Sequence, residues 1–143
     1  MSVEIKKIVV GLDGSEKSFN ALKEALNWAK RLEAEIIAVH VLPIPSEFVD
    51  LGGMIIEIEA ELRKEGEAIL ERGAEEAKKE GVPYTGVLLE GNAPESIANY
   101  AEEYDVDLLI VGYQGKSMLS ELIMGSVTSK LLNISKVPVL VVK

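Results

Sequence analysis

The chain has 143 residues, of which 48% are hydrophobic and 27% charged, and its formal net charge is −9. This length and composition are typical of one globular domain, so we expect a single domain over residues 1–143. The chain has no cysteine and one histidine, His40, which excludes disulfides, thiolate catalysis and multi-histidine zinc sites. The acidic balance argues against nucleic-acid binding, and no apolar run reaches the roughly 18 residues that a membrane span needs.

The charge is unevenly distributed along the chain. Residues 1–111 hold 11 basic and 23 acidic side chains, whereas residues 112–143 hold 4 and 1. An anionic ligand would therefore meet the least repulsion near the C-terminal third. The first residues also lack the apolar core and cleavage site of a secretory signal, so we expect a cytoplasmic protein.

The first half of the chain alternates strand and helix patterns. Ile8–Leu12 predicts a strand that ends at Asp13, and apolar residues at helical spacing follow as far as Leu32. Ile36–Val41 predicts a second strand. The connection 43–54 contains two prolines but also several apolar residues (Phe48, Val49, Leu51 and Met54), which suit either a lid over a ligand or a contact with a partner subunit.

The second half continues the same alternation. A long helix is predicted over Ile56–Glu80, followed by a strand over Tyr84–Leu89. Asn92-Ala93-Pro94-Glu95 is typical of a helix start, with Asn92 as the cap and Glu95 at capping-box spacing; this helix runs to about Tyr104. Three further elements complete the pattern: a strand over Asp107–Val111, a helix over Val127–Asn133 and a strand over Val137–Val142.

Uniformly apolar strands that alternate with helices indicate an α/β fold with an open parallel sheet covered by helices on both faces. Ligands of such sheets bind outside the carboxyl ends of the strands, at the point where the winding reverses. If the strands that end at Asp13 and Gly112 are neighbours, residues 13–15 and 112–128 line one cleft.

A glycine-rich segment follows the fourth strand. Two residues separate Gly112 from Gly115, and nine more lead to Gly125 and Ser126 at the start of a helix. Free amides at a helix start bind anions, and glycine permits positive φ and close approach of a ligand to the main chain. The spacing differs from that of a Walker A motif and of a dinucleotide fingerprint. The segment therefore indicates a phosphate site of another kind, with ordinary loop and capping chemistry as the alternative.

In this spacing the chain resembles the ATP-binding branch of the universal stress protein family. The resemblance extends over essentially the whole chain, from Asp13 through Val39-His40-Val41 and Gly91-Asn92-Ala93-Pro94-Glu95 to the terminal strand. It implies a Rossmann-like sheet of strand order 3-2-1-4-5 that binds ATP, or ADP or AMP, with Mg or Mn accompanying the phosphates, and that forms homodimers. One departure is visible, because Tyr113 and Gln114 stand where the family more often has a small hydroxyl residue followed by Arg or His.

The resemblance also assigns roles to individual residues. Asp13 is expected near the ribose or a bound Mg or Mn ion, and the main chain around Val41 near adenine. The ribose and phosphates are expected among Gly112, Gly115, Gly125, Ser126, Val127 and Thr128.

Each of these residues also has a structural interpretation. Asp13 can start the turn or cap the first helix, and Ser126 and Thr128 can act as helix caps. Lys116 can neutralise phosphate charge or lie in solvent. We interpret His40 as a hydrogen-bonded strand residue rather than as a base.

The last strand, Val137–Val142, is apolar on both faces and carries Pro138, which suits a sheet edge. A bare edge of this kind invites pairing, so we expect a homodimer built on this strand.

Few groups near the glycine segment are suited to phosphoryl transfer, since no arginine follows Arg72. We therefore expect any hydrolysis to be slow, and the family resemblance implies a stress-response or signalling protein that acts as a nucleotide-dependent switch on an unknown protein partner. The alternative is a slow ATPase or an autophosphorylating enzyme that needs a partner.

Overall fold

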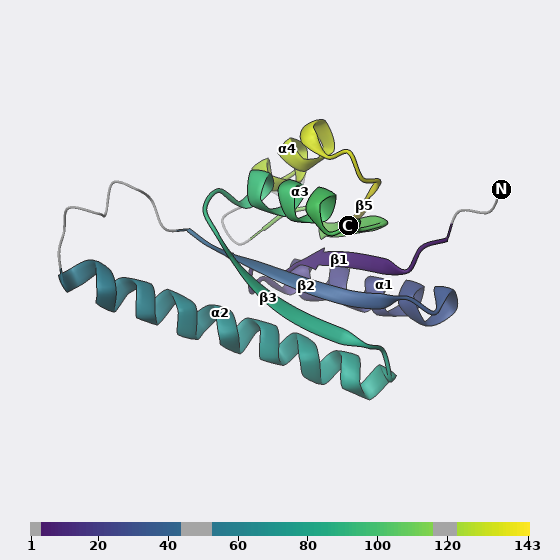
Figure 1. Cartoon of the computed structure of the whole chain (residues 1–143), viewed down its shortest axis with the longest axis horizontal. Helices are drawn as coiled ribbons and strands as arrows, with labels where there is room; N and C mark the ends of the chain where they lie inside the picture. Colours follow the sequence, from purple (N-terminus) through teal and green to yellow (C-terminus); the bar gives the residue numbers. More distant parts are fainter. Residues whose placement is uncertain (1–3, 44–52, 116–122) are drawn as a thin grey trace.

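The structure is a computed structural model that describes residues 4–43, 53–115 and 123–143. Within them lies a five-stranded parallel sheet of order β3-β2-β1-β4-β5, which confirms the predicted fold class and strand order (Figure 1). The strands are β1 (Lys7–Gly11), β2 (Glu35–Leu42), β3 (Tyr84–Glu90), β4 (Leu108–Gly112) and β5 (Val139–Val142). The helices are α1 (Glu16–Leu32), α2 (Gly53–Glu80), α3 (Ala93–Glu103) and α4 (Ser126–Ile134).

Helices cover both faces of the sheet, as the apolar strands predict. Alternate residues of β1 point to opposite faces, so that Ile8 and Val10 join a core with α1 and α2, whereas Val9 joins a core with α3 and α4. In Figure 1 the two helix pairs lie on opposite sides of the sheet. The winding reverses after β3, because the chain returns to place β4 beside β1.

The ends of the elements differ from the predicted ones by a few residues. The predicted start of the last strand at Val137 is wrong by two residues. There the Ser135 hydroxyl donates to the Val137 carbonyl at 2.6 Å and accepts from the Val137 amide at 3.0 Å, which forms a local turn before the ladder begins. At the start of α3, Asn92 occupies the cap position but makes no side-chain cap hydrogen bond, so the predicted capping box is absent.

Two glycines bring α2 close to β2 and β3. A methyl group on Gly66 would lie 2.7 Å from Cδ2 of His40, and one on Gly73 would lie 2.5 Å from the Tyr84 hydroxyl oxygen. The Tyr84 hydroxyl donates to the Leu70 carbonyl of α2 at 2.7 Å. These contacts explain why α2 carries small residues in the middle of an otherwise charged helix.

The Tyr84 contact gives a testable dependence of stability on pH. Burial, with a smaller contribution from the Glu71 carboxylate, raises the pKa of Tyr84 to about 12. Between about pH 10 and pH 12 the unfolded chain releases this proton while the folded chain keeps it, so the free energy of unfolding falls as the pH rises. In Tyr84→Phe we expect this loss to be smaller by on the order of 1 kcal/mol, allowing for the water around a half-buried ring.

Urea unfolding of both proteins at about pH 9 and about pH 11 measures this difference. The lost hydrogen bond should also lower the stability of Tyr84→Phe by about 1 kcal/mol at about pH 9, and this difference from the wild type should become smaller at about pH 11. If the free energy of unfolding fell equally in the two proteins between about pH 9 and about pH 11, the raised pKa of Tyr84 would be contradicted.

Candidate functional site

A cleft of about 220 Å³ opens where β1 and β4 end, at the predicted reversal of winding. The structure brings the sequence-predicted residues of both segments together in its wall: Asp13, Val41, Gly112, Gly115, Gly125, Ser126, Val127 and Thr128. Lys116 and residues 44–52 of the predicted lid or interface lie outside the described residues.

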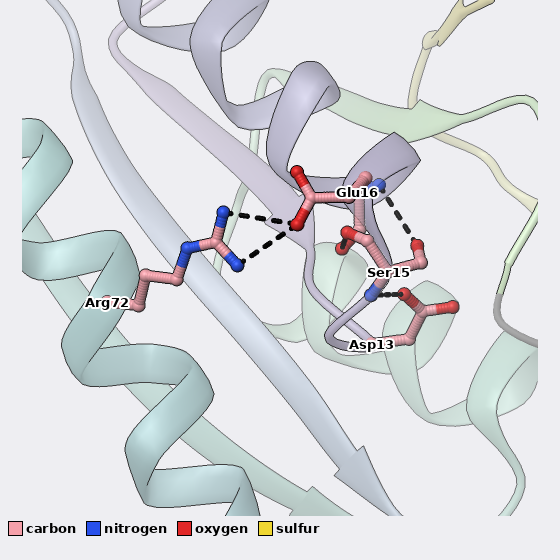
Figure 2. A network of polar contacts seen from close by, with 5 residues as sticks. Asp13, Ser15, Glu16 and Arg72 are labelled. Atoms are coloured by element: carbon pink, nitrogen blue, oxygen red, sulfur yellow. Dashed lines mark hydrogen bonds and ion pairs between the residues drawn. The ribbon is translucent and has the colours of Figure 1, made fainter.

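The turn after β1 is held by Asp13. Its Oδ1 accepts from the Ser15 amide at 2.9 Å, and the Ser15 hydroxyl in turn accepts from the Ser18 amide at 3.1 Å and so caps α1 (Figure 2). A methyl group on Gly115 would lie 2.5 Å from Oδ2 of Asp13, so the second carboxylate oxygen faces the glycine segment. The predicted role of Asp13 in starting the turn is confirmed, and its position in the cleft also suits a ligand contact.

An ion pair from α2 reaches the same turn. Nη1 and Nη2 of Arg72 both donate to Oε1 of Glu16 at 3.3 Å (Figure 2). The guanidinium also lies 3.8 Å from the centre of the Phe19 ring. Exposed ion pairs contribute little alone, but stacking on an aromatic ring fixes the guanidinium plane. Arg72 thus links α2 to the first turn of α1 beside Asp13.

The His40 side chain of β2 contacts the backbone just after the end of β1. Its Nδ1 lies 2.7 Å from the Leu12 carbonyl oxygen. A carbonyl oxygen only accepts, so Nδ1 carries the proton. The Leu12 amide also donates to the Val39 carbonyl at 2.8 Å. The interpretation of His40 as a hydrogen-bonded strand residue is confirmed.

Two of the three motif glycines, Gly112 and Gly125, leave room for the backbone of the protein itself. A methyl group on Gly112 would lie 3.0 Å from the Lys17 carbonyl oxygen, and one on Gly125 would lie 3.2 Å from Cα of Gln114. Gly112, Gly115 and Gly125 are not among the described glycines with positive φ. The positive φ that glycine permits is therefore not used at these three positions, whereas the close approach of a ligand to their main chain stays a prediction.

The start of α4 supplies the predicted free amides. Gly125 is the cap residue, with φ −63° and ψ 151° and no side-chain cap bond, and its own amide donates to the Tyr113 carbonyl at 2.9 Å. Ser129 donates to the Gly125 carbonyl at 2.9 Å and closes the first turn of the helix. The amides of Ser126, Val127 and Thr128 precede that bond and have no acceptor within the helix. Such amides, together with the positive end of the helix dipole, favour an anion at this end of the cleft.

Two buried polar side chains fix the glycine segment. The Thr128 hydroxyl donates to the Gly112 carbonyl at 2.7 Å and so joins α4 to the end of β4. Nε2 of Gln114 donates to the carbonyl of Ile123, the first described residue after the gap at 116–122. The Gln114 side chain thus links the start of the glycine segment to the residues just before α4. Tyr113 lies outside the cleft wall, with the Lys143 ammonium 5.2 Å from its ring centre.

Sequence reasoning missed part of the cleft wall. The missed residues are mostly small or apolar, with two larger polar side chains among them: Gly11, Leu12, Ser18, Val39, His40, Ala93, Ile97, Val111 and Gln114. The only sequence feature that could have identified them is their position, because they lie toward the ends of strands or near the starts of helices that meet at this edge. They give the cleft an apolar side opposite its polar end.

Comparisons with known proteins agree with this fold. Residues 4–143 match the model of the Universal stress protein family. The universal stress protein YxiE of Bacillus subtilis (strain 168) is 35% identical to the chain over 151 residues, covering 96% of this chain and 98% of YxiE. The chain belongs to the universal stress protein family, as its resemblance indicates.

Solved structures of relatives have the same architecture. The structure of MJ0577 from Methanocaldococcus jannaschii superposes with a TM-score of 0.88 at 32% identity, covering 99% of this chain and 97% of that one. A universal stress protein solved in complex with cAMP superposes with a TM-score of 0.78 at 27% identity, covering 99% of each chain.

The Thr128 contact can be tested by removing its hydroxyl. Thr128→Val keeps the shape but leaves the Gly112 carbonyl without this donor, so we expect the free energy of unfolding to fall by about 1–3 kcal/mol. Thr128→Ser keeps the hydroxyl and is the matched control, with a smaller loss from the missing methyl. Urea unfolding measures both. A Thr128→Val protein as stable as the wild type would show that this bond does not hold α4 on β4.

Proposed function

We propose that the protein binds an adenine nucleotide, with ATP as the favoured ligand, and acts as a homodimeric nucleotide-dependent switch in a stress response. The observation that carries the proposal is the start of α4, where the amides after Gly125, which have no acceptor within the helix, lie at a cleft opposite Asp13. A phosphate group matches this site in charge and in hydrogen bonding. The similar structure in complex with cAMP supports an adenine nucleotide as the class of ligand.

In the proposed complex the phosphates lie against the main chain of Gly115, Gly125 and Ser126–Thr128. The ribose lies between Asp13 and Gly112, and adenine meets the main chain around Val41. The apolar side of the cleft supports this orientation, since Val39 and Ile97 offer a dry surface for a flat ring.

The donor set also fits a divalent cation. Asp13 presents a carboxylate oxygen toward the glycine segment. Mg is commonly held by one or two carboxylates together with the phosphates of the nucleotide. In this proposal Asp13 holds Mg or Mn, which when bound neutralises part of the phosphate charge.

The described wall of the cleft favours holding a nucleotide over processing it. Asp13 is the only side chain with a formal charge among its described residues at neutral pH. Lys130, on the exposed side of α4, lies 3.8 Å from Glu95. Efficient phosphoryl transfer needs a clamp of cationic groups and a residue that orients the nucleophile. We therefore propose a binding protein whose hydrolysis of ATP is slow.

Calorimetry with nucleotide-free protein tests the ligand. We expect ATP to bind more tightly with Mg than without it, because Asp13 and the phosphates share the cation. Asp13→Asn keeps the oxygen that accepts from Ser15 but removes the charge, so it should weaken binding in Mg by about tenfold and binding without Mg much less. Asp105→Asn, between α3 and β4, is the matched control and should bind as the wild type does.

Two further outcomes decide the proposal. Denaturing the purified protein and identifying released nucleotide by mass should yield an adenine nucleotide. If none is released, and calorimetry detects no uptake of ATP, ADP, AMP or cAMP, the proposal of an adenine-nucleotide site is overturned.

The edge at β5 supports the proposed homodimer. All four residues of β5 are only partly buried, and β4 covers one edge of the strand. The Leu109 and Tyr113 amides donate to the carbonyls of Pro138 and Val142, so the even-numbered residues face β4. The backbone groups of Val139 and Val141 therefore point to the outer edge, where a second copy can pair with them.

Proline at this edge tests the dimer. Val141→Pro removes an outward amide and leaves the even-numbered bonds to β4 in place, so we expect the dimer to become monomeric. Sedimentation equilibrium gives the mass, and circular dichroism confirms that the sheet remains. Gly86→Pro, at the opposite edge strand β3, is the control and should stay dimeric. A Val141→Pro protein that is folded and still dimeric would exclude β5 as the interface.

A further inference from the structure

The opposite edge of the sheet, β3, lacks the features that usually block an edge strand. Of its seven residues only Glu90, the last, is charged, and the strand contains no proline. Thr85 and Gly86 are exposed. Natural sheets protect such edges with charges, prolines or bulges, because unpaired backbone groups recruit other strands. In the described part of the chain, β2 is the only strand that pairs with β3.

The register shows which backbone groups face outward. The Ile36 amide donates to the Pro83 carbonyl at 2.9 Å, and the Gly91 amide donates to the Leu42 carbonyl at 3.1 Å. With the parallel register of β2 and β3, these bonds turn the odd-numbered residues of β3 toward β2. The amides and carbonyls of Gly86 and Leu88 therefore point to the open edge.

A groove runs beside this edge, between β3 and α2, with a volume of about 440 Å³. Its walls are Glu67, Leu70, Glu71 and Ala74 of α2 and Tyr84, Gly86 and Leu88 of β3. The missing side chain of Gly86 opens it, since a methyl group there would lie 3.2 Å from Cβ of Leu70. In Figure 1 α2 lies along β3 for most of the length of the strand.

The charged residues that line the groove are both acidic and both belong to α2. Glu67 and Glu71 are exposed on its rim, and neither forms an ion pair within the described residues. The two arginines of α2 are turned to other acids, Arg63 to Glu90 at 2.8 Å and Arg72 to Glu16 at 3.3 Å. The rim therefore presents two negative charges for which the described structure supplies no cation.

The spacing of these charges matches that of an added strand. Residues four apart on a helix are about 6 Å apart along its axis, and alternate residues of a strand are about 6.6 Å apart. Successive same-face side chains of a strand paired with β3 would thus lie beside Glu67 and then Glu71. Two lysines or arginines fit these places.

We propose that the edge of β3 and the groove beside it bind an extended basic segment of a partner protein by strand addition. The segment pairs its backbone with Gly86 and Leu88 and places alternate Lys or Arg side chains against Glu67 and Glu71. The surface is separate from the nucleotide cleft, so it goes beyond the proposed nucleotide binding and is tested independently of it.

The probe is a fluorescent eight-residue peptide that alternates lysine and threonine, followed by anisotropy against the full chain. We expect saturable binding together with slower hydrogen exchange at the Gly86 and Leu88 amides. A peptide that alternates glutamate and threonine, and a lysine–threonine peptide with N-methylated backbone amides on the paired edge, should both bind at least about tenfold more weakly. Equal binding of the N-methylated peptide would overturn strand addition, and equal binding of the acidic peptide would overturn the charge assignment.

Variants of α2 separate the groove from the general negative charge of the protein. The double variant Glu67→Lys with Glu71→Lys should weaken binding of the basic peptide by about tenfold or more. The double variant Glu57→Lys with Glu61→Lys makes the same charge change at the same spacing on α2, outside the groove, and should lose much less. Equal losses in the two double variants would overturn the groove as the site.

A second copy of the chain is the competing occupant. If the protein alone associates through β3, Gly86→Pro will lower its mass in sedimentation and the peptide will compete with self-association. That result would overturn the partner proposal in favour of a second self-interface. Calorimetry with ATP on the same variants reports separately on the cleft, so failure of one proposal is distinguishable from failure of the other.

Discussion

The cleft depends on the close approach of three backbone segments at Gly112. A side chain at Gly112 would press on the Lys17 carbonyl of α1, and the Gly112 carbonyl accepts from the Thr128 hydroxyl of α4. The end of β4 is therefore fixed against both helix layers at once. Since packed interiors leave few gaps, this one position sets where α4 begins. The amides that follow Gly125 face the cleft for this reason.

The turn on the other side of the cleft is fixed by a second set of contacts. His40 holds the Leu12 carbonyl, and Asp13 holds the Ser15 amide. Arg72 reaches from α2 to Glu16 in the same first turn of α1. Glu71, the residue before Arg72, is part of the rim of the groove at β3. The helix α2 therefore contacts the turn beside the proposed nucleotide site and also forms one wall of the proposed partner surface. None of the helices in the described residues has the length and apolar character that a membrane span requires.

Much of the fold could be predicted from the sequence because strands buried on both faces must be uniformly apolar. Ile8–Leu12 and Asp107–Val111 mark such strands, and parallel winding then brings Asp13 and Gly112 together. The first and last residues of helices and strands depend on contacts that the hydrophobic pattern does not encode. One example is the turn at Ser135, after which β5 begins at Val139 rather than at Val137. The motif glycines lie in the wall of the cleft, but none of them has the positive φ that glycine permits. Which neighbour crowds a glycine is set by tertiary packing.

The tie between Thr128 and Gly112 was likewise beyond the sequence. A threonine in the first turn of a helix is common as a capping residue, and only the structure shows its hydroxyl directed to a strand 16 positions away. Gln114 is a similar case, since only the structure shows that this buried side chain in the cleft wall donates to the Ile123 carbonyl.

The central claim is that the start of α4 holds phosphate. The most direct measurement is a nuclear magnetic resonance titration of isotope-labelled, nucleotide-free protein with ATP and Mg, followed at the backbone amides. The account predicts the largest shifts at Gly115, Gly125, Ser126, Val127 and Thr128, with adenosine alone leaving the α4 amides nearly unchanged. Shifts confined to other surfaces, or identical α4 shifts with adenosine and ATP, would contradict it.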